Sequence, residues 1–141
     1  DKHSREVAML QLAGPYTCVL LRAGISCQAV ASLLADKAII KCGVGVHVDT
    51  KLLREQFGMA CTAALDLNAI ERHKPEIGLP SGCVGLRRLA AATLGAEISK
   101  EESIRCGDWA APVLSREQVE YAALDAIASR AVLLAMLKCA C

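Results

Sequence analysis

The sequence predicts a single mixed α/β domain in which short strands alternate with helices. Its 141 residues suit one domain with a core of its own. Apolar residues make up 54% of the chain and charged residues 22%, which is typical of a globular protein and not of a disordered one. The chain has no internal repeat. Its predicted elements follow the order β β α β α β α, a linker, α, a loop and a final α.

The first two predicted strands form an antiparallel hairpin. Val7–Ala13 is a short apolar run and Tyr16–Leu21 is a second β-type run, with a Gly-Pro turn signal between them. The spacing of the next apolar residues predicts a helix over Cys27–Leu34, and Ser26 is the candidate N-cap of this helix.

A strand followed by a helix is predicted twice in the middle of the chain. The first pair consists of the β-branched run Ala38–Val46, which suits a buried strand, and a helix over Thr50–Phe57. The second pair consists of a strand over Ala60–Leu67 and a helix over Asn68–His73, for which Asp66 is the expected N-cap.

The last part of the chain is predicted to be mostly helical. Lys74–Cys83 contains two Pro and two Gly and is expected to be a long loop. A helix follows over Gly85–Leu94, with Gly95 as its natural C-cap. Ile98–Trp109 is expected to be irregular, and Ser115–Leu137 has the apolar spacing of one long helix.

Two features of the final helix are specific local signals. Ser115 and Gln118 form a capping box, which satisfies free backbone N–H groups at a helix start. Tyr121 and Asp125 are four residues apart and therefore project from the same face. A phenol and a carboxylate stacked in this way can hold a metal ion and orient a water. The spacing alone also fits a helix with one incidental Tyr-Asp pair.

Composition limits the partners and the compartment. A formal net charge of +1 gives no general attraction to nucleic acid, so such binding would depend on a local patch. The eight cysteines are scattered through apolar segments without C-x-x-C spacing, which favours an intracellular, reducing compartment. No secretory signal and no span of membrane length is visible, and no membrane partner is expected. Cytoplasm, nucleus and organelle are not distinguished.

Three stretches of the chain carry a family resemblance. In chain order they are Val7–Leu12, then Lys41–Val46 with Asp49 and Lys51–Leu53, and finally Ser103–Trp109 with Leu114, Gln118 and Tyr121–Ala126. They resemble, in order and approximate spacing, the strand after the first motif, the second motif and the third motif of the ribonuclease D and Werner-type 3′-5′ exonucleases. The resemblance runs from about Val7 to Leu137. It implies a ribonuclease-H-like fold, a mixed sheet flanked by helices.

The resemblance also implies a site that holds two divalent metal ions, Mg²⁺ or Mn²⁺. Members of the family bind them with four acids, which are an Asp-x-Glu pair on the first strand and one Asp on each of the second and third motifs. By motif matching, Asp49 is the third acid, Asp125 is the fourth, and Tyr121 orients the attacking water, as in the Tyr-containing branch of these enzymes. For Asp49 the alternative is a helix N-cap.

The Asp-x-Glu pair has no counterpart in this chain. Asp1 and Glu6 are five residues apart and would lie on opposite faces of a strand. Residues 1–141 are therefore expected to form one exonuclease-like domain that is incomplete at its N-terminal side relative to the family, without the first central strand. That strand is expected from upstream sequence outside this record, with a partner chain or a rearranged fold as the alternatives.

Substrate contacts are the least specific prediction. The candidates for phosphate contact are Lys51, Arg87, Arg88, Lys100 and Arg105. For each of them an ordinary solvated side chain is the alternative. Trp109 is expected either to anchor the core or to stack on a base. RNA and DNA are not distinguished.

Two functions are consistent with these observations. The first is a 3′-5′ exonuclease domain that hydrolyses phosphodiester bonds at nucleic acid 3′ ends by two-metal catalysis. The alternative is a catalytically inactive exonuclease-like domain that serves as a structural or binding subunit, as in a ribonucleoprotein assembly. The retained Tyr121, Asp125 and Asp49 favour the first function, and the missing Asp-x-Glu pair favours the second.

Overall fold

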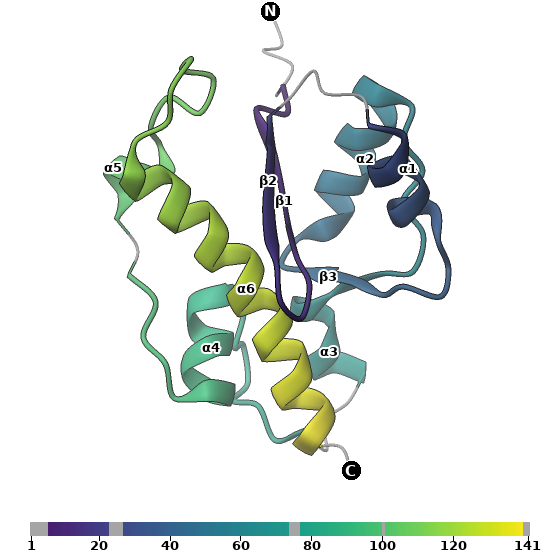
Figure 1. The fold of residues 1–141 in the computed structure, drawn as a ribbon. Helices are drawn as coiled ribbons and strands as arrows, with labels where there is room; N and C mark the ends of the chain where they lie inside the picture. Colours follow the sequence, from purple (N-terminus) through teal and green to yellow (C-terminus); the bar gives the residue numbers. More distant parts are fainter. Residues whose placement is uncertain (1–5, 23–26, 74–76, 100, 140–141) are drawn as a thin grey trace, which may run out of the picture.

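The computed structural model describes residues 6–22, 27–73, 77–99 and 101–139 (Figure 1). Its elements are β1 (Met9–Ala13), β2 (Cys18–Arg22), α1 (Gln28–Ala35), β3 (Lys41–Gly43), α2 (Val46–Phe57), β4 (Ala64–Asp66), α3 (Leu67–His73), α4 (Leu86–Leu94), α5 (Glu102–Arg105) and α6 (Arg116–Cys139). The mixed α/β class and the predicted order of elements are confirmed. The one addition is α5, a single turn within the segment that was expected to be irregular.

The strands form two separate two-stranded sheets among the described residues. β1 and β2 make the predicted antiparallel hairpin, in which Met9 pairs with Arg22 and Ala13 with Cys18. β3 and β4 pair in parallel, with Cys42 opposite Leu65. No described strand connects the hairpin to the β3–β4 pair, so the sheet is interrupted between β1 and β3.

The prediction of a strand over Ala38–Val46 was too long. Only Lys41–Gly43 is strand, because Gly45 turns the chain with a φ of 70° and α2 begins at Val46. The alternative that Asp49 is a helix N-cap is therefore wrong, since Asp49 lies in the first turn of α2 and Gly45 is the N-cap.

Other predicted helix ends agree with the structure. The Oδ1 atom of Asp66 accepts the backbone N–H of Asn68 at 3.0 Å, which caps α3 as expected. Gly95 ends α4 in the left-handed conformation. The capping box is formed in both directions, since Ser115 Oγ accepts the Gln118 N–H at 3.1 Å and Gln118 Oε1 accepts the Ser115 N–H at 2.9 Å. Ser26, the candidate cap of α1, lies outside the described residues.

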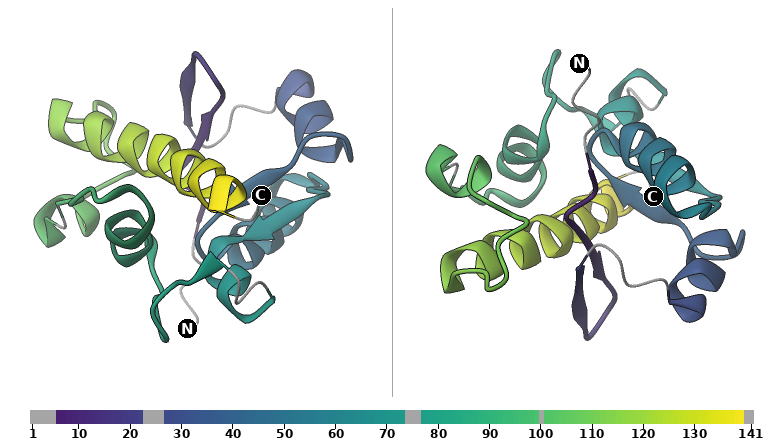
Figure 2. Two further views of the ribbon diagram at one scale, coloured as in Figure 1. Left: turned by 90° about the horizontal axis from the view of Figure 1, so that it is seen from below. Right: turned by 90° about the horizontal axis from the view of Figure 1, so that it is seen from above.

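The long helix α6 holds the molecule together. It lies between the β1–β2 hairpin and α4, as both views of Figure 2 show. One buried cluster joins α6 to α3 and α4 through residues such as Val132, Leu67 and Leu89, which are 0% exposed. A second cluster of Leu34, Leu53 and Met59 joins α1 to α2, and Leu10 and Leu12 of β1 pack against it. Among the described residues, no helix is both long and apolar enough to span a membrane.

Candidate active site

One open cavity of about 1540 Å³ brings together the three residues that motif matching selected. Tyr121 and Asp125 line it from α6, and Asp49 lines it from the first turn of α2. They come from segments more than 70 residues apart in the chain, so the fold and not the sequence spacing makes them neighbours of one space.

The phenol of Tyr121 keeps its proton more strongly than an ordinary tyrosine. Partial burial raises the pKa of Tyr121 most, and the nearby charges of Asp125 and Cys106 raise it further, while Arg105 lowers it. The phenol is therefore protonated at neutral pH and can donate one hydrogen bond into the cavity.

The two carboxyl groups also have raised pKa values. Burial raises the pKa of Asp125, which is half-buried on α6. Asp49 has an exposed side chain, but desolvation by the protein around it is still the largest cause of its raised pKa; His47 lowers that pKa and the charge of Asp66 raises it. A bound cation would reverse this desolvation cost, because it would compensate the carboxylate charges.

Asp66 holds the turn that precedes Asp49. The sequence predicted Asp66 only as a helix N-cap and not in this second role. Its Oδ1 accepts the backbone N–H of Gly45 at 3.1 Å, and its Oδ2 lies 3.3 Å from His47 Nδ1. Asp66 thereby joins the β4–α3 junction to the β3–α2 turn. Only the register of the parallel β3–β4 pair brings these two junctions together, and no local sequence pattern shows that register.

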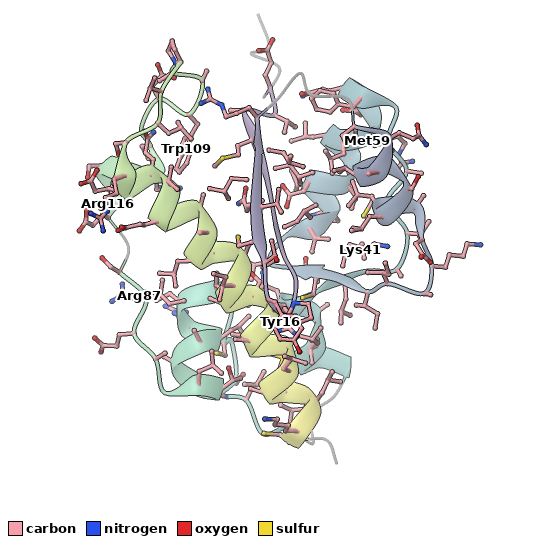
Figure 3. The ribbon with its side chains drawn as sticks, viewed as in Figure 1. Tyr16, Lys41, Met59, Arg87, Trp109 and Arg116 are labelled. Carbon is pink, nitrogen blue, oxygen red and sulfur yellow. The ribbon has the colours of Figure 1, made fainter. Side chains whose placement is uncertain are left out.

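Trp109 supports Tyr121 instead of filling the core. The two rings lie 6.1 Å apart between centroids with an interplanar angle of 48°. The indole N–H donates to the backbone carbonyl of Arg105 at 3.0 Å. In Figure 3 Trp109 is labelled beside the first turns of α6. Of the two sequence-based alternatives, the core anchor is wrong because Trp109 is only half-buried.

The predicted basic residues divide into two groups. Arg87, Arg88 and Arg105 line the cavity with the carboxylates. Lys51 does not line it and lies 3.8 Å from Glu55 as an exposed helical ion pair. Lys100 lies outside the described residues. Two more basic residues, Lys41 and Arg130, line the cavity and were missed; Arg130 is five residues after Asp125 on α6.

The cavity offers the kind of ligand atom that a hard divalent cation prefers, but too few of them. Carboxylate oxygens are the ligands that Mg²⁺ and Mn²⁺ prefer. Among the residues that the structure describes, however, no group of three or more His, Cys, Asp and Glu side chains is arranged to hold a metal ion. The acidic side chains that line the cavity are those of Asp49, Glu97 and Asp125.

Comparison with known proteins places the chain in a family. A family model described as "3′-5′ exonuclease" matches residues 3–138. The chain belongs to the 3′-5′ exonuclease family. This confirms the resemblance that the three motifs carried.

Relatives of this 3′-5′ exonuclease domain include curated proteins and solved structures. It is 33% identical over 139 residues to the human "Exonuclease 3′-5′ domain-containing protein 2", a match that covers 93% of this chain and 22% of that protein. It is 32% identical to the mouse "Bifunctional 3′-5′ exonuclease/ATP-dependent helicase WRN", over 72% of this chain and 7% of that protein. The structure of the Aedes aegypti Nibbler EXO domain superposes with a TM-score of 0.81 at 22% identity, over 99% of this chain and 73% of that one. The ribonuclease-H-like exonuclease fold is thus confirmed. The chain spans about a fifth or less of the two curated relatives.

Proposed function

We propose that this domain hydrolyses phosphodiester bonds at the 3′ ends of nucleic acids, with Asp49, Asp125 and Tyr121 as one half of its catalytic site. The observation that supports this most is that all three side chains line one cavity, although they come from separate motifs. The chain's membership in the 3′-5′ exonuclease family also supports this reaction.

Each residue has a distinct role in this proposal. Asp49 and Asp125 offer carboxylate oxygens to divalent cations, which when bound supply an activated water and stabilise the leaving oxygen. Tyr121, kept protonated by its raised pKa, holds a water or phosphate oxygen with its hydroxyl group. Arg87, Arg88 and Arg105 contact the phosphate backbone of the substrate. Because two carboxylates alone bind Mg²⁺ or Mn²⁺ weakly, the complete site takes further acids from outside the described residues.

The same shortage of acids favours a second candidate function. A domain that kept the fold without a complete ligand set would serve as a structural or nucleic-acid-binding subunit, as in a ribonucleoprotein assembly. We also infer a reducing compartment, because the seven cysteines that the structure describes are all free thiols.

A nuclease assay separates the two candidates. The protein purified from its native source, with any sequence that flanks residues 1–141, would be incubated with 5′-labelled single-stranded RNA or DNA in Mg²⁺ or Mn²⁺, and shortening from the 3′ end would be followed on gels. We expect metal-dependent shortening that Asp125→Asn removes by about a hundredfold or more, the usual cost of losing an essential catalytic group. The matched control is Glu120→Gln, the same kind of change at an exposed position of α6. Binding without shortening, unchanged in Asp125→Asn, would instead support the non-catalytic subunit.

A further inference from the structure

The segment that joins α5 to α6 is tied to the first turn of α6 by the side chain of Gln118. The Nε2 atom of Gln118 donates a hydrogen bond to the backbone carbonyl of Asp108 at 3.1 Å. The Oε1 atom of the same amide accepts the Ser115 N–H at 2.9 Å as part of the capping box. One side chain therefore makes two different contacts, of which one belongs to the start of the helix and the other holds the preceding segment.

This segment is held closely and from two sides. A Cβ atom at Gly107 would lie 3.1 Å from the carbonyl oxygen of Ile104 and 3.3 Å from Gln118 Nε2, which is closer than favourable van der Waals contact. The absence of a side chain at Gly107 thus lets the amide reach the backbone. On the other side, the guanidinium group of Arg22 in β2 donates to the backbone carbonyl of Ala111. The segment is therefore fixed both to α6 and to the hairpin.

The segment carries Trp109, which follows Asp108 directly and contacts two groups of the site. Its ring lies 6.1 Å from the ring of Tyr121 at an interplanar angle of 48°, an attractive arrangement for an aromatic pair (Figure 3). Its indole N–H donates to the Arg105 carbonyl at 3.0 Å. Tyr121 and Arg105 line the cavity, whereas Trp109 and Gln118 do not. Side chains outside the cavity thus hold groups that face it.

We infer that Gln118 is a positioning residue for Tyr121: its bond to the Asp108 carbonyl seats Trp109 against the phenol ring and fixes where the Tyr121 hydroxyl group lies. The backbone of α6 sets the position of the Tyr121 Cβ atom but leaves rotation about the side-chain bonds open. A fixed neighbouring ring selects one of these rotamers. The consequence for hydrolysis rests on the proposed function, in which this hydroxyl group holds a water or phosphate oxygen and must be placed accurately.

Two substitutions separate this positioning from helix capping. Gln118→Glu keeps an oxygen that can accept the Ser115 N–H, because Glu and Gln both serve in a capping box, but a carboxylate cannot donate to the Asp108 carbonyl. Ser115→Ala does the reverse, since it removes the acceptor of the Gln118 N–H and leaves the bond to Asp108. In urea denaturation, Ser115→Ala should therefore lose more stability than Gln118→Glu, whose carboxylate is also favoured near a helix N-terminus.

Fluorine NMR measures the contact between the two rings without any nuclease activity. The protein would be prepared with any sequence that flanks this domain and with 5-fluorotryptophan in place of tryptophan. The resonance missing from Trp109→Phe belongs to Trp109, and Tyr121→Leu gives its position without the phenol ring. We expect Gln118→Glu to move the Trp109 resonance toward that position, and Ser115→Ala to leave it in place. Gly107→Ala, which crowds the Gln118 amide, should move it in the same direction as Gln118→Glu.

Steady-state kinetics on 5′-labelled strands in Mg²⁺ or Mn²⁺ measures the consequence for hydrolysis. Gln118→Glu should lower kcat by up to about a hundredfold, because a displaced catalytic group can cost this much even when the change lies outside the site. KM should stay unchanged, since the hydroxyl group acts on the reacting oxygen and not on the rest of the strand. Ser115→Ala should keep both constants.

An unmoved Trp109 resonance in Gln118→Glu would overturn the inference. A moved resonance with an unchanged kcat, in a protein that hydrolyses the strand, would also overturn it. Failure of the proposed function is distinguishable, because the parent protein itself would then show no metal-dependent hydrolysis. In that case the resonance alone decides whether Gln118 positions Tyr121.

Discussion

At the scale of single residues, the site depends on how three polar groups are held at the margin of an apolar space. Tyr121 is supported from one side by the indole of Trp109 and lies one helical turn before Asp125. Asp49 is supported through Asp66, which bonds to the backbone N–H of Gly45 in the preceding turn. The raised pKa values of all three groups have desolvation as their largest cause. A positive charge bound in the cavity would therefore stabilise the ionised forms of Asp49 and Asp125.

The first prediction concerns the coupling between Tyr121 and Asp125. Asp125→Asn removes a negative charge that raises the pKa of Tyr121, so that pKa should fall while remaining above the ordinary tyrosine value because burial persists. A near-ultraviolet absorbance titration of tyrosinate measures it, since the chain has only two tyrosines and Tyr16 is 99% exposed. Tyr121→Phe identifies the component that belongs to Tyr121. An unchanged titration in Asp125→Asn would show that the two side chains are not electrostatically coupled.

The second prediction concerns stability against pH. Burial raises the pKa of Asp125 in the folded state, so the folded chain binds this proton more tightly than the unfolded chain does. The stabilisation from this group is complete below the unfolded pKa of about 3.9 and is lost as pH rises through the folded pKa. Asp125→Asn imitates the neutral form. It should raise the free energy of unfolding at pH 7 by up to about 1 kcal/mol, since the half-buried carboxylate keeps part of its hydration.

Urea titrations of Asp125→Asn and the parent chain at neutral pH and near pH 3 test this prediction. The difference between them should vanish at the lower pH, where both side chains are neutral. Glu120→Gln, which changes an exposed carboxylate on the same helix, should show no comparable gain at pH 7. A variant that is less stable at pH 7 would mean that the carboxylate is compensated in the folded protein.

At the scale of elements, α6 carries most of the arrangement, and its start is well specified by the sequence. The capping box, the apolar spacing and the Tyr-Asp pair are all local, which is why they could be predicted. The sequence pattern did not locate the β3–α2 turn to the exact residue. Gly45 in the left-handed conformation starts α2 four residues earlier than the pattern suggested, and Asp49 moves from a capping position into the first turn.

The third prediction concerns the start of α6. Ser115→Ala removes the hydroxyl group that accepts the Gln118 N–H at 3.1 Å and should lower the free energy of unfolding by about 1 kcal/mol. The matched control is Arg116→Ala, which loses only an exposed, solvent-screened ion pair with Glu120 and should lower the free energy of unfolding less. Urea denaturation ranks the two variants. Equal losses would show that the box contributes no more than a surface pair.

At the scale of the whole molecule, the fold class, the hairpin and the order of elements followed from the sequence, but the cavity between the two sheets did not. Each strand pattern is local, whereas the joining of two strand pairs into one sheet depends on a strand between them. Among the described residues no such strand is present. In the structure, β1 and β3 both line the cavity that Asp49, Tyr121 and Asp125 also line. Trp109 and Asp66 likewise support the site through tertiary contacts, and such contacts leave no local pattern in the sequence from which they could be predicted.

The last prediction concerns divalent cations at the cavity. If Asp49 and Asp125 hold such an ion, as the proposed function requires, Mn²⁺ or Mg²⁺ should raise the melting temperature of the chain only slightly, because two carboxylates bind these ions weakly and weak binding gives little stabilisation.

Asp125→Asn removes one of the two carboxylates and should abolish this increase in melting temperature, while Glu120→Gln, at an exposed position of the same helix, should keep it. Thermal denaturation of the three proteins with and without the metal measures the effect. An equal increase in Asp125→Asn would show that the ion binds elsewhere, and the domain would then lack the metal chemistry that the proposed function needs.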